Sequence, residues 1–168
     1  MAISSQPVIQ PATYDDHEAV GRLQFLSHTV SFAPFASERW LKSRRLDDYV
    51  ARWRDTLGSS TAGTLTAVAR LDGNVVGMVR VAPSDGPGPD AQLTGMHVEP
   101  VLRGGGIGTL LMLHALEFIR EQDFDRVQLG VIAANDGARR FYESHGWELV
   151  EERPDGVEGV PVVIYELV

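Results

Sequence analysis

The sequence of 168 residues contains no cysteine, no unbroken run of eighteen apolar residues and no excess of basic charge. Without cysteine there can be no disulfide, no thiolate nucleophile and no cysteine-ligated zinc. Without a long apolar run, a membrane-spanning helix is not expected. The stretch MAISSQPVIQPATYDD also lacks the basic start and apolar core of a secretory signal peptide. We therefore expect a cytoplasmic protein with no membrane partner.

Charge and length further narrow the classes of protein to which this sequence can belong. Lys and Arg number 15 against 23 Asp and Glu, a formal net charge of −8, so nucleic acid is not an expected partner. The acidic balance mildly favours a cationic substrate, although solubility is the commoner explanation. The hydrophobic content of 43% suits a single domain over 1–168, in which residues 1–6 are expected to be flexible. His17, His28 and His145 lack metal-ligand spacing, so no metal is expected.

Hydrophobic periodicity predicts the element order helix, helix, three strands, helix, strand, helix and strand. Thr13 suits the N-cap of the first helix, and a second helical region runs from Ser37 to Gly58. The later elements are expected at 64–71, 75–82, 91–98, 107–119, 126–132, 135–146 and 162–168. This order fits one α/β or α+β domain with antiparallel strands first and parallel crossovers later.

The stretch RGGGIG, residues 103–108, places four glycines between a predicted strand and an apolar helix. Glycine disfavours helix, but it permits unusual backbone angles and lets a phosphate approach the main chain. The first N–H groups of a helix lack intrahelical partners and lie at the positive end of the helix dipole. The stretch therefore predicts an anion-binding site, to which Arg103 adds a fixed positive charge.

Two common phosphate-binding motifs do not fit this stretch. A Walker loop requires a lysine that is absent here, which disfavours nucleotide hydrolysis. The dinucleotide motif G-x-G-x-x-G, read from Gly104 and Gly106, meets Thr109 where it needs a third glycine. A dinucleotide-dependent oxidoreductase is therefore only a third possibility.

The stretch MHVEPVLRGGGIGTLLM resembles the acetyl-CoA signature of the GCN5-related N-acetyltransferase (GNAT) family, [RQ]-x-x-G-x-[GA]. Arg103, Gly106 and Gly108 fill its fixed positions. Further along, NDGARRFYESHGW resembles the family's later motif, N-x-x-A-x-x-x-Y-x-x-x-G-[FW]. The two motifs stand in family order and place an acetyl-CoA-binding core at 93–150. The residues that match the later motif are Asn135, Ala138, Tyr142, Gly146 and Trp147.

The resemblance implies the acyl-CoA N-acyltransferase fold, a mixed, mostly antiparallel sheet flanked by helices. In this fold a central pair of parallel strands splays apart, and acetyl-CoA lies in the V-shaped gap. The pantetheine arm would pair with the freed strand edge, and the pyrophosphate would bind the glycine-rich loop. The coenzyme-binding residues that the resemblance implies are Met96, His97, Val98, Arg103, Gly104, Gly105, Gly106, Ile107, Gly108, Thr109, Asn135, Ala138 and Tyr142.

The implied activity moves the acetyl group of acetyl-CoA to a primary amine of a small molecule, peptide or protein by direct attack in a ternary complex. Tyr142, whose ordinary pKa is about 10, would protonate the departing thiolate. His97, with an ordinary pKa near 6.5, is the best candidate for the base. Glu99, Glu38 and a water chain are alternatives. Two positions at which relatives often carry a basic Glu are held here by Gly130 and Gln92.

Several questions stay open at this level. Phe32, Phe35 and Trp40 fall where the family usually forms its acceptor pocket, although core packing explains them as well. Acceptor pockets are built from variable loops and helices, so the sequence does not name the acceptor. A non-catalytic acyl-CoA-binding sensor is the alternative to an enzyme, and Tyr142 discriminates between them. The stretch PVVIYELV suits either a homodimer interface or an interior strand.

Overall fold

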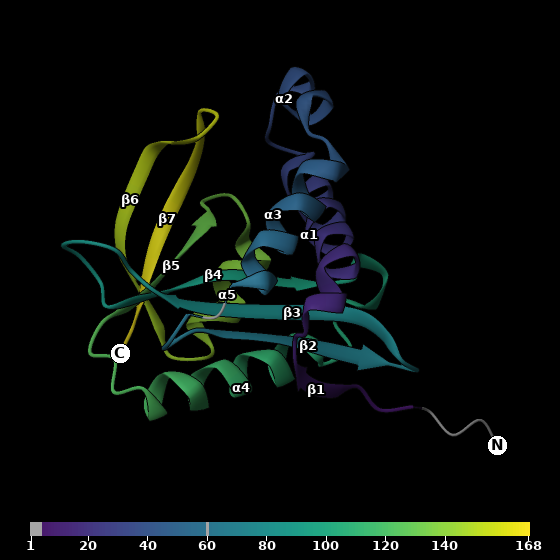
Figure 1. Cartoon of the computed structure of the whole chain (residues 1–168). Coiled ribbons are helices and arrows are strands. Elements are labelled where there is room, and N and C mark those ends of the chain that lie inside the picture. The colour runs from purple at the N-terminus through teal and green to yellow at the C-terminus, as the bar shows by residue number, and fades with distance from the viewer. Residues whose placement is uncertain (1–4, 60) are drawn as a thin grey trace.

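The computed structural model describes residues 5–59 and 61–168, so residues 1–4 of the segment expected to be flexible lie outside the described residues. Over the described ranges, seven strands form one sheet in the order β1-β2-β3-β4-β5-β7-β6 (Figure 1). The strands are β1 (Val8–Pro11), β2 (Leu65–Leu71), β3 (Asn74–Pro83), β4 (Ala91–Val98), β5 (Val127–Ile132), β6 (Trp147–Val157) and β7 (Val160–Leu167). The helices are α1 (His17–Phe32), α2 (Glu38–Ser43), α3 (Leu46–Gly58), α4 (Ile107–Glu121) and α5 (Asp136–Glu143).

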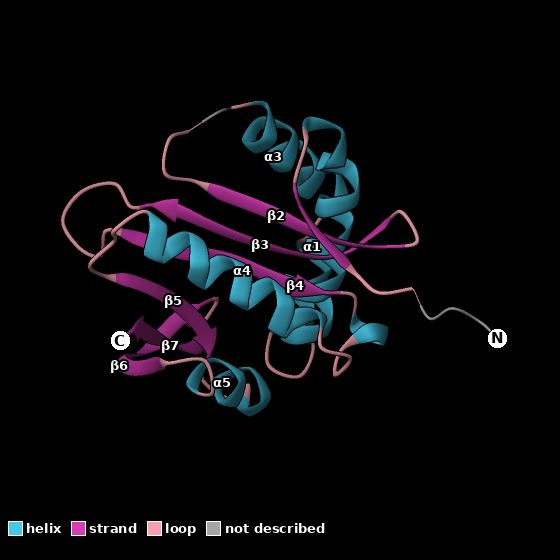
Figure 2. Cartoon of the chain, turned by 90° about the horizontal axis from the view of Figure 1, so that it is seen from below, coloured by secondary structure: helices cyan, strands magenta, loops and turns pink. Residues whose placement is uncertain are grey.

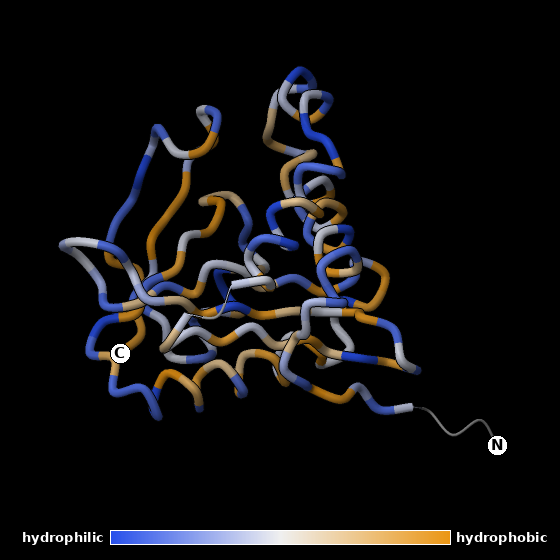
Figure 3. Tube along the Cα trace, viewed as in Figure 1, coloured by the Kyte–Doolittle hydropathy of each residue, from blue (hydrophilic) through white to orange (hydrophobic). Residues whose placement is uncertain are grey.

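Helices cover both faces of the sheet. Figures 1 and 2 show α1 and α3 on one face and α4 and α5 on the other. Because successive side chains of a strand point to opposite faces, β3 serves both layers. Its Val79 and Val81 pack with α4, whereas Met78 packs with α1 and α3. Hydrophobic residues accordingly follow the central strands and α4 (Figure 3), and the sheet has a buried core on each side.

The mixed, mostly antiparallel sheet expected from the resemblance is confirmed. Neighbouring strands run antiparallel except β4 and β5, which are parallel and are connected through α4. The element order predicted more than one parallel crossover, whereas the described strands have one, from β4 to β5. The stretch PVVIYELV forms β7, which is an interior strand between β5 and β6.

The predicted elements differ from the structure at both edges of the sheet. No strand is predicted for β1 or β6, and these are the two outermost strands. Edge strands need not bury alternate side chains, and Trp147 is the buried residue of β6. Figure 3 shows β6 as largely hydrophilic beside a hydrophobic β7. The usual two-residue periodicity is therefore missing where the sheet ends.

The second helical region is divided into α2 and α3. Ser37 caps α2 by accepting a hydrogen bond from the Trp40 N–H (3.1 Å), and α3 ends at Gly58 as predicted. Between the two helices, Arg44 has extended backbone angles. Its guanidinium donates to the Phe25 carbonyl oxygen (2.9 Å) and lies over the Tyr49 ring, 5.1 Å from its centroid. These contacts fix the break, and sequence periodicity does not detect them.

The parallel strands β4 and β5 separate soon after they begin. They pair only through Ala91 with Val127 and Gln92 with Gln128, after which each strand continues without the other. On its opposite side, β4 carries one extra residue, because Arg80 of β3 faces Gly95 and Val81 faces Leu93. A bulge of this kind bends its strand. The bulge at Thr94 thus lies where the two strands diverge, and a V-shaped gap opens beyond it.

Candidate functional site

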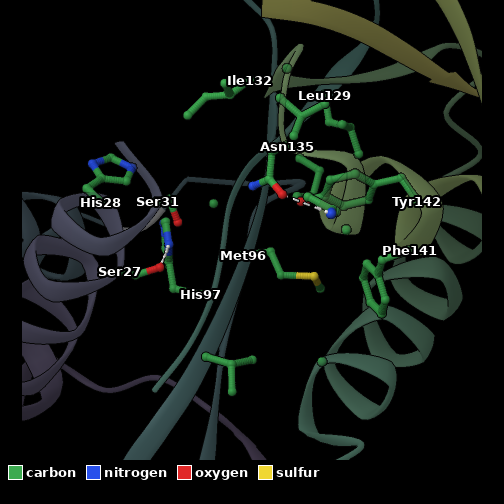
Figure 4. Close-up of a pocket in the computed structure, with 18 of the residues that line it drawn as sticks. Ser27, His28, Ser31, Met96, His97, Leu129, Ile132, Asn135, Phe141 and Tyr142 are labelled. Carbon is green, nitrogen blue, oxygen red and sulfur yellow. Dashed lines mark hydrogen bonds between the residues drawn. The ribbon is translucent and has the colours of Figure 1, made fainter. Parts of the chain in front are cut away.

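A cavity of about 1020 Å³ fills the gap between β4 and β5. Its volume is at the upper end of the usual range for ligand sites, about 300–1,000 Å³. Its walls come from α1, β4, the loop at 102–106, the first turn of α4, β5, α5 and the β6–β7 hairpin. Figure 4 shows Tyr142 and Asn135 on one side of the cavity and Ser27, His28 and His97 on the other. Of the residues predicted to bind coenzyme, only Gly105 is not part of the lining.

The glycine-rich loop leaves an open surface at the start of α4. Gly104 and Gly106 have φ angles of 81° and 89°, in the left-handed region that favours glycine. A Cβ atom on either residue would meet nothing within 4 Å. Leu110 makes the first helical hydrogen bond, to the Gly106 carbonyl oxygen (3.1 Å), so the N–H groups of 107–109 lie in the helix turn that has no helical acceptors. This arrangement suits an anion.

Asn135 lies at the end of the loop that follows β5 and is the N-cap residue of α5. Its side-chain Oδ1 accepts a hydrogen bond from the Ala138 N–H at 3.1 Å, which caps the helix. Figure 4 shows this hydrogen bond and the Asn135 amide group at the cavity. Because Oδ1 is engaged, the NH₂ group is the part of Asn135 that can donate to a ligand.

Tyr142 lies on α5 and lines the cavity beneath Asn135. Its ring packs edge-on against Phe141, with 5.6 Å between ring centroids, and against Trp147, with 6.4 Å. Burial raises the pKa of Tyr142 to about 12, so the hydroxyl is protonated at neutral pH. Among the described residues the hydroxyl has no hydrogen-bond partner, which leaves its proton available to a ligand.

His97 points from β4 toward α1, away from Tyr142 (Figure 4). Its Nδ1 lies 2.9 Å from the Ser27 Oγ, to which Arg103 also donates a hydrogen bond at 3.1 Å. Burial, with smaller contributions from His28 and Arg103, lowers the pKa of His97 to about 3. The imidazole is therefore neutral at pH 7 and a weak base, which makes a general-base role less favourable than its ordinary pKa suggests.

A second histidine stands against the first. The His28 and His97 rings meet edge to face with 5.1 Å between centroids, and the His28 Nδ1 lies 3.2 Å from the Tyr49 hydroxyl. Burial and the charges of Arg44 and Arg52 lower the pKa of His28 to about 4. The α1 side of the cavity thus presents two neutral imidazoles.

The polar residues of α1 were not predicted as site residues. Ser27, His28 and Ser31 line the cavity, and Ser27 is 3% exposed. Ser27 and Ser31 are one helical turn apart, so both fall on the same helix face. The sequence does carry a signal for these residues: polar side chains recur at this spacing on the helix face that packs against the sheet.

The cavity has no acidic lining. Over 5–59 and 61–168 no Asp or Glu lines it, and its charged side chains are Arg103 and Arg153. The lining includes Gly130 and Gln92, so the two positions at which relatives often carry a basic Glu bring no carboxylate to the cavity. Of the alternative bases, Glu99 is outside the lining, and Glu38 pairs with the Lys42 Nζ at 2.8 Å on α2. The strongly acidic composition therefore places no negative charge in this cavity.

The three aromatic residues near the helix junction have different positions. Phe32 lines the cavity, and Trp40 packs on Phe32 with 4.9 Å between ring centroids. Phe35 instead lines a separate cavity of about 360 Å³ beside the β6–β7 turn. In the part of the chain that the structure describes, no helix is long and apolar enough to cross a membrane.

The comparisons with known proteins agree with this geometry. The chain resembles the crystal structure of the PaiA N-acetyltransferase of Thermoplasma acidophilum in complex with coenzyme A, with a TM-score of 0.80 and 19% identity over 96% of this chain and 98% of that one. It also resembles yncA of Salmonella typhimurium with its cofactor acetyl-CoA, with a TM-score of 0.73 and 20% identity over 97% and 94% of the two chains. At this level of identity, the likenesses show the fold.

The sequence model of the acetyltransferase (GNAT) family matches residues 24–147. The chain therefore belongs to the GNAT acetyltransferase family, and the resemblance seen in its two motifs is confirmed. The N-acetylaspartate synthetase of Rattus norvegicus is 38% identical over 85 residues, which are 51% of this chain and 28% of that protein. The matched region spans a third or less of the N-acetylaspartate synthetases, whose covered shares are 28% to 33%.

Proposed function

We propose that the protein transfers the acetyl group of acetyl-CoA to a primary amine by direct attack in a ternary complex. The observation that carries this proposal is the convergence of three donors on one cavity. These are the open N–H groups at the start of α4, the unpaired edge of β4 and the free hydroxyl of Tyr142. Few ligands other than a coenzyme A thioester require an anion site, a strand edge and a proton donor in one groove.

The coenzyme end of the cavity supplies mainly backbone groups. The N–H groups of 107–109 and the side chain of Arg103 would hold the pyrophosphate. The main chain of 96–98, which has no strand on its β5 side, would pair with the pantetheine arm. The NH₂ group of Asn135 would donate to the same arm from the opposite wall. In this arrangement affinity for the coenzyme depends little on side-chain identity.

In the reaction the amine nitrogen attacks the thioester carbonyl carbon, a C–N bond forms and the C–S bond breaks. A backbone N–H near the end of β4 would polarise the carbonyl. The sulfur departs as a thiolate and takes the proton of the Tyr142 hydroxyl. As the amide forms, the nitrogen releases a proton to water, and Tyr142 recovers a proton from the same water. Burial that disfavours a phenolate also disfavours a thiolate formed beside it, so the proton transfer remains feasible despite the raised pKa of Tyr142.

The amine must lose a proton before or during attack. For a lysine-like amine with a pKa near 10.4, deprotonation at pH 7 costs about 4.6 kcal/mol. Neither His28 nor His97 is a strong base, and no carboxylate among the described residues lines the cavity. We assign the proton to water, because the described lining offers no stronger base.

Replacement of Tyr142 by Phe tests the proposal. We expect kcat to fall about 100-fold or more, because a positioned general acid typically contributes that much. The Kd for coenzyme A, measured by calorimetry, should stay within about threefold, since the backbone makes most contacts. Coenzyme release should depend on added amine. Tight binding of acetyl-CoA without amine-dependent release would instead support the non-catalytic acyl-CoA-binding alternative.

A further inference from the structure

We propose that the acceptor is an amine that also carries a carboxylate, as an amino acid does, and that Arg153 is the residue that selects it. This inference rests on the proposed acetyl transfer and specifies its substrate class. Two observations carry it: the sign of the charges around the cavity, and the position of Arg153 at the end away from the coenzyme loop.

The charge of the lining decides which amines can enter. Primary amines arrive mainly as ammonium ions at pH 7. The described lining contains two arginines, two neutral imidazoles and no carboxylate, and the Glu151 carboxylate that pairs with Arg153 stands outside the lining. An ammonium ion with no other charge would find no carboxylate in this lining to pair with. An amine that brings its own carboxylate enters with no net charge and meets a cationic partner.

The sheet register places Arg153 level with the last residue of β5. Arg153 on β6 faces Val162 on β7, which in turn faces Ile132 on β5. Directly opposite residues share a face of a sheet, so these three side chains form one row on the cavity side. Gly130 lies on the same face of β5, and a Cβ there would meet only the Ile164 Cδ1, at 3.6 Å. Val162 and Ile132 are apolar, so Arg153 is the charged group of this row, and its partner Glu151 stands in the neighbouring row, which runs through Ile164 to Gly130.

The two arginines differ in what they can still bind. Arg103 stands next to the glycine-rich loop and donates to Ser27, so a pyrophosphate is its natural partner. Arg153 is paired with Glu151, at 2.8 Å from Nε to Oε1 and 2.9 Å from NH2 to Oε2. Both side chains of this pair are about half exposed, at 53% and 49%. Exposed ion pairs contribute little, so a ligand carboxylate can displace Glu151 or share the guanidinium with it.

Matched acceptors provide the first test. The full-length protein is assayed with acetyl-CoA and an amino acid, the carboxamide of that amino acid, or a diamine. We expect kcat/KM for the amino acid to exceed that for its carboxamide by about tenfold or more, because a charge-assisted pair is lost in the carboxamide. Equal kcat/KM for the two would overturn the substrate assignment and leave the acetyl transfer standing. Absence of turnover with every amine would overturn the acetyl transfer itself, and the assignment with it.

Variants of the ion pair give the second test. Arg153→Gln should raise KM for the amino acid about tenfold with a smaller change in kcat, and leave KM for the carboxamide unchanged. Arg153→Lys should recover part of the loss. Glu151→Gln breaks the same ion pair but frees Arg153, so it should lower KM for the amino acid. If Arg153 only braces the hairpin, both Gln variants would raise KM alike, which would refute its role in selection.

A matched control separates this effect from the loss of any surface ion pair. Arg22 on α1 pairs with Glu18 at 3.0 Å, is comparably exposed and lies outside the cavity lining. Arg22→Gln should leave both KM values unchanged. A rise in KM for the amino acid in this variant as large as in Arg153→Gln would also overturn the proposal.

Discussion

The proposed coenzyme end and acceptor end of the cavity present different kinds of groups to a ligand. At the coenzyme end the groups that face the cavity are mostly main-chain atoms, made accessible by Gly104 and Gly106 and by the free edge of β4. At the acceptor end they are side chains of α1, β6 and β7, such as His28, Phe32 and Arg153. The first end depends on backbone conformation and therefore requires particular residues. The second depends on side chains that can be exchanged without altering the fold.

The largest effect in this comparison is expected from Gly106→Ala. The added methyl group occupies the open space before the N–H groups of 107–109, and we expect the Kd for coenzyme A to rise about tenfold or more. Gly73→Ala is the matched control, because Gly73 also has a left-handed φ, 81°, and an open Cβ position, but lies in the β2–β3 turn.

Both variants should lose about 1 kcal/mol or more of unfolding free energy, the cost of a left-handed alanine. Only Gly106→Ala should weaken the binding of coenzyme A in calorimetry. Equal affinity in the two variants would show that the loop is an ordinary strand-to-helix connection.

The next effect is on stability rather than on coenzyme affinity, and it is expected at the α1 wall of the cavity. Ser27→Ala removes the hydroxyl that links His97 to Arg103 and leaves both without this partner. We expect a loss of about 1–3 kcal/mol in the free energy of unfolding, measured in urea. Ser31→Ala is the control, since the Ser31 hydroxyl has no hydrogen bond to another described residue, and it should lose clearly less. Similar losses in both variants would argue against a structural role for the Ser27 bridge.

The most gradual effect concerns pH. In the unfolded chain His28 and His97 titrate near 6.5, whereas in the fold their pKa values are about 4 and about 3. Below pH 6.5 the unfolded state therefore binds more protons, and stability should fall as the pH drops from 6.5 toward 4. Urea unfolding across this range checks the slope. His28→Gln should reduce the slope, and an unchanged slope would mean that other groups cause it.

The comparison also explains what the sequence could predict. The glycine-rich loop and the motif around Asn135 and Tyr142 are visible in the sequence because each residue satisfies a backbone or positioning requirement. The inner strands were predicted because they bury alternate or continuous apolar residues. The edge strands β1 and β6 were missed because they bury few residues and show no such period.

The acceptor end was hardest to predict because its contacts join distant parts of the chain. Ser27 meets His97, which is 70 residues away, and Arg153 reaches the cavity through its register with β7. Neither relation leaves a local pattern. The break between α2 and α3 has the same origin, since Arg44 is held by contacts with α1. Local propensity thus specified the coenzyme end, and tertiary pairing specified the acceptor end.

The extra residue at Thr94 makes the shape of the site sensitive to chain length more than to chemistry. Thr94 has no partner on β3, so deleting it would leave the Arg80–Gly95 and Val81–Leu93 pairs adjacent and give an unbroken ladder without the bend that a bulge introduces. Met96 and His97 would keep their partners on β3 and their faces of the sheet. The identity of residue 94 can therefore vary, whereas its removal would straighten β4 at the point where it leaves β5.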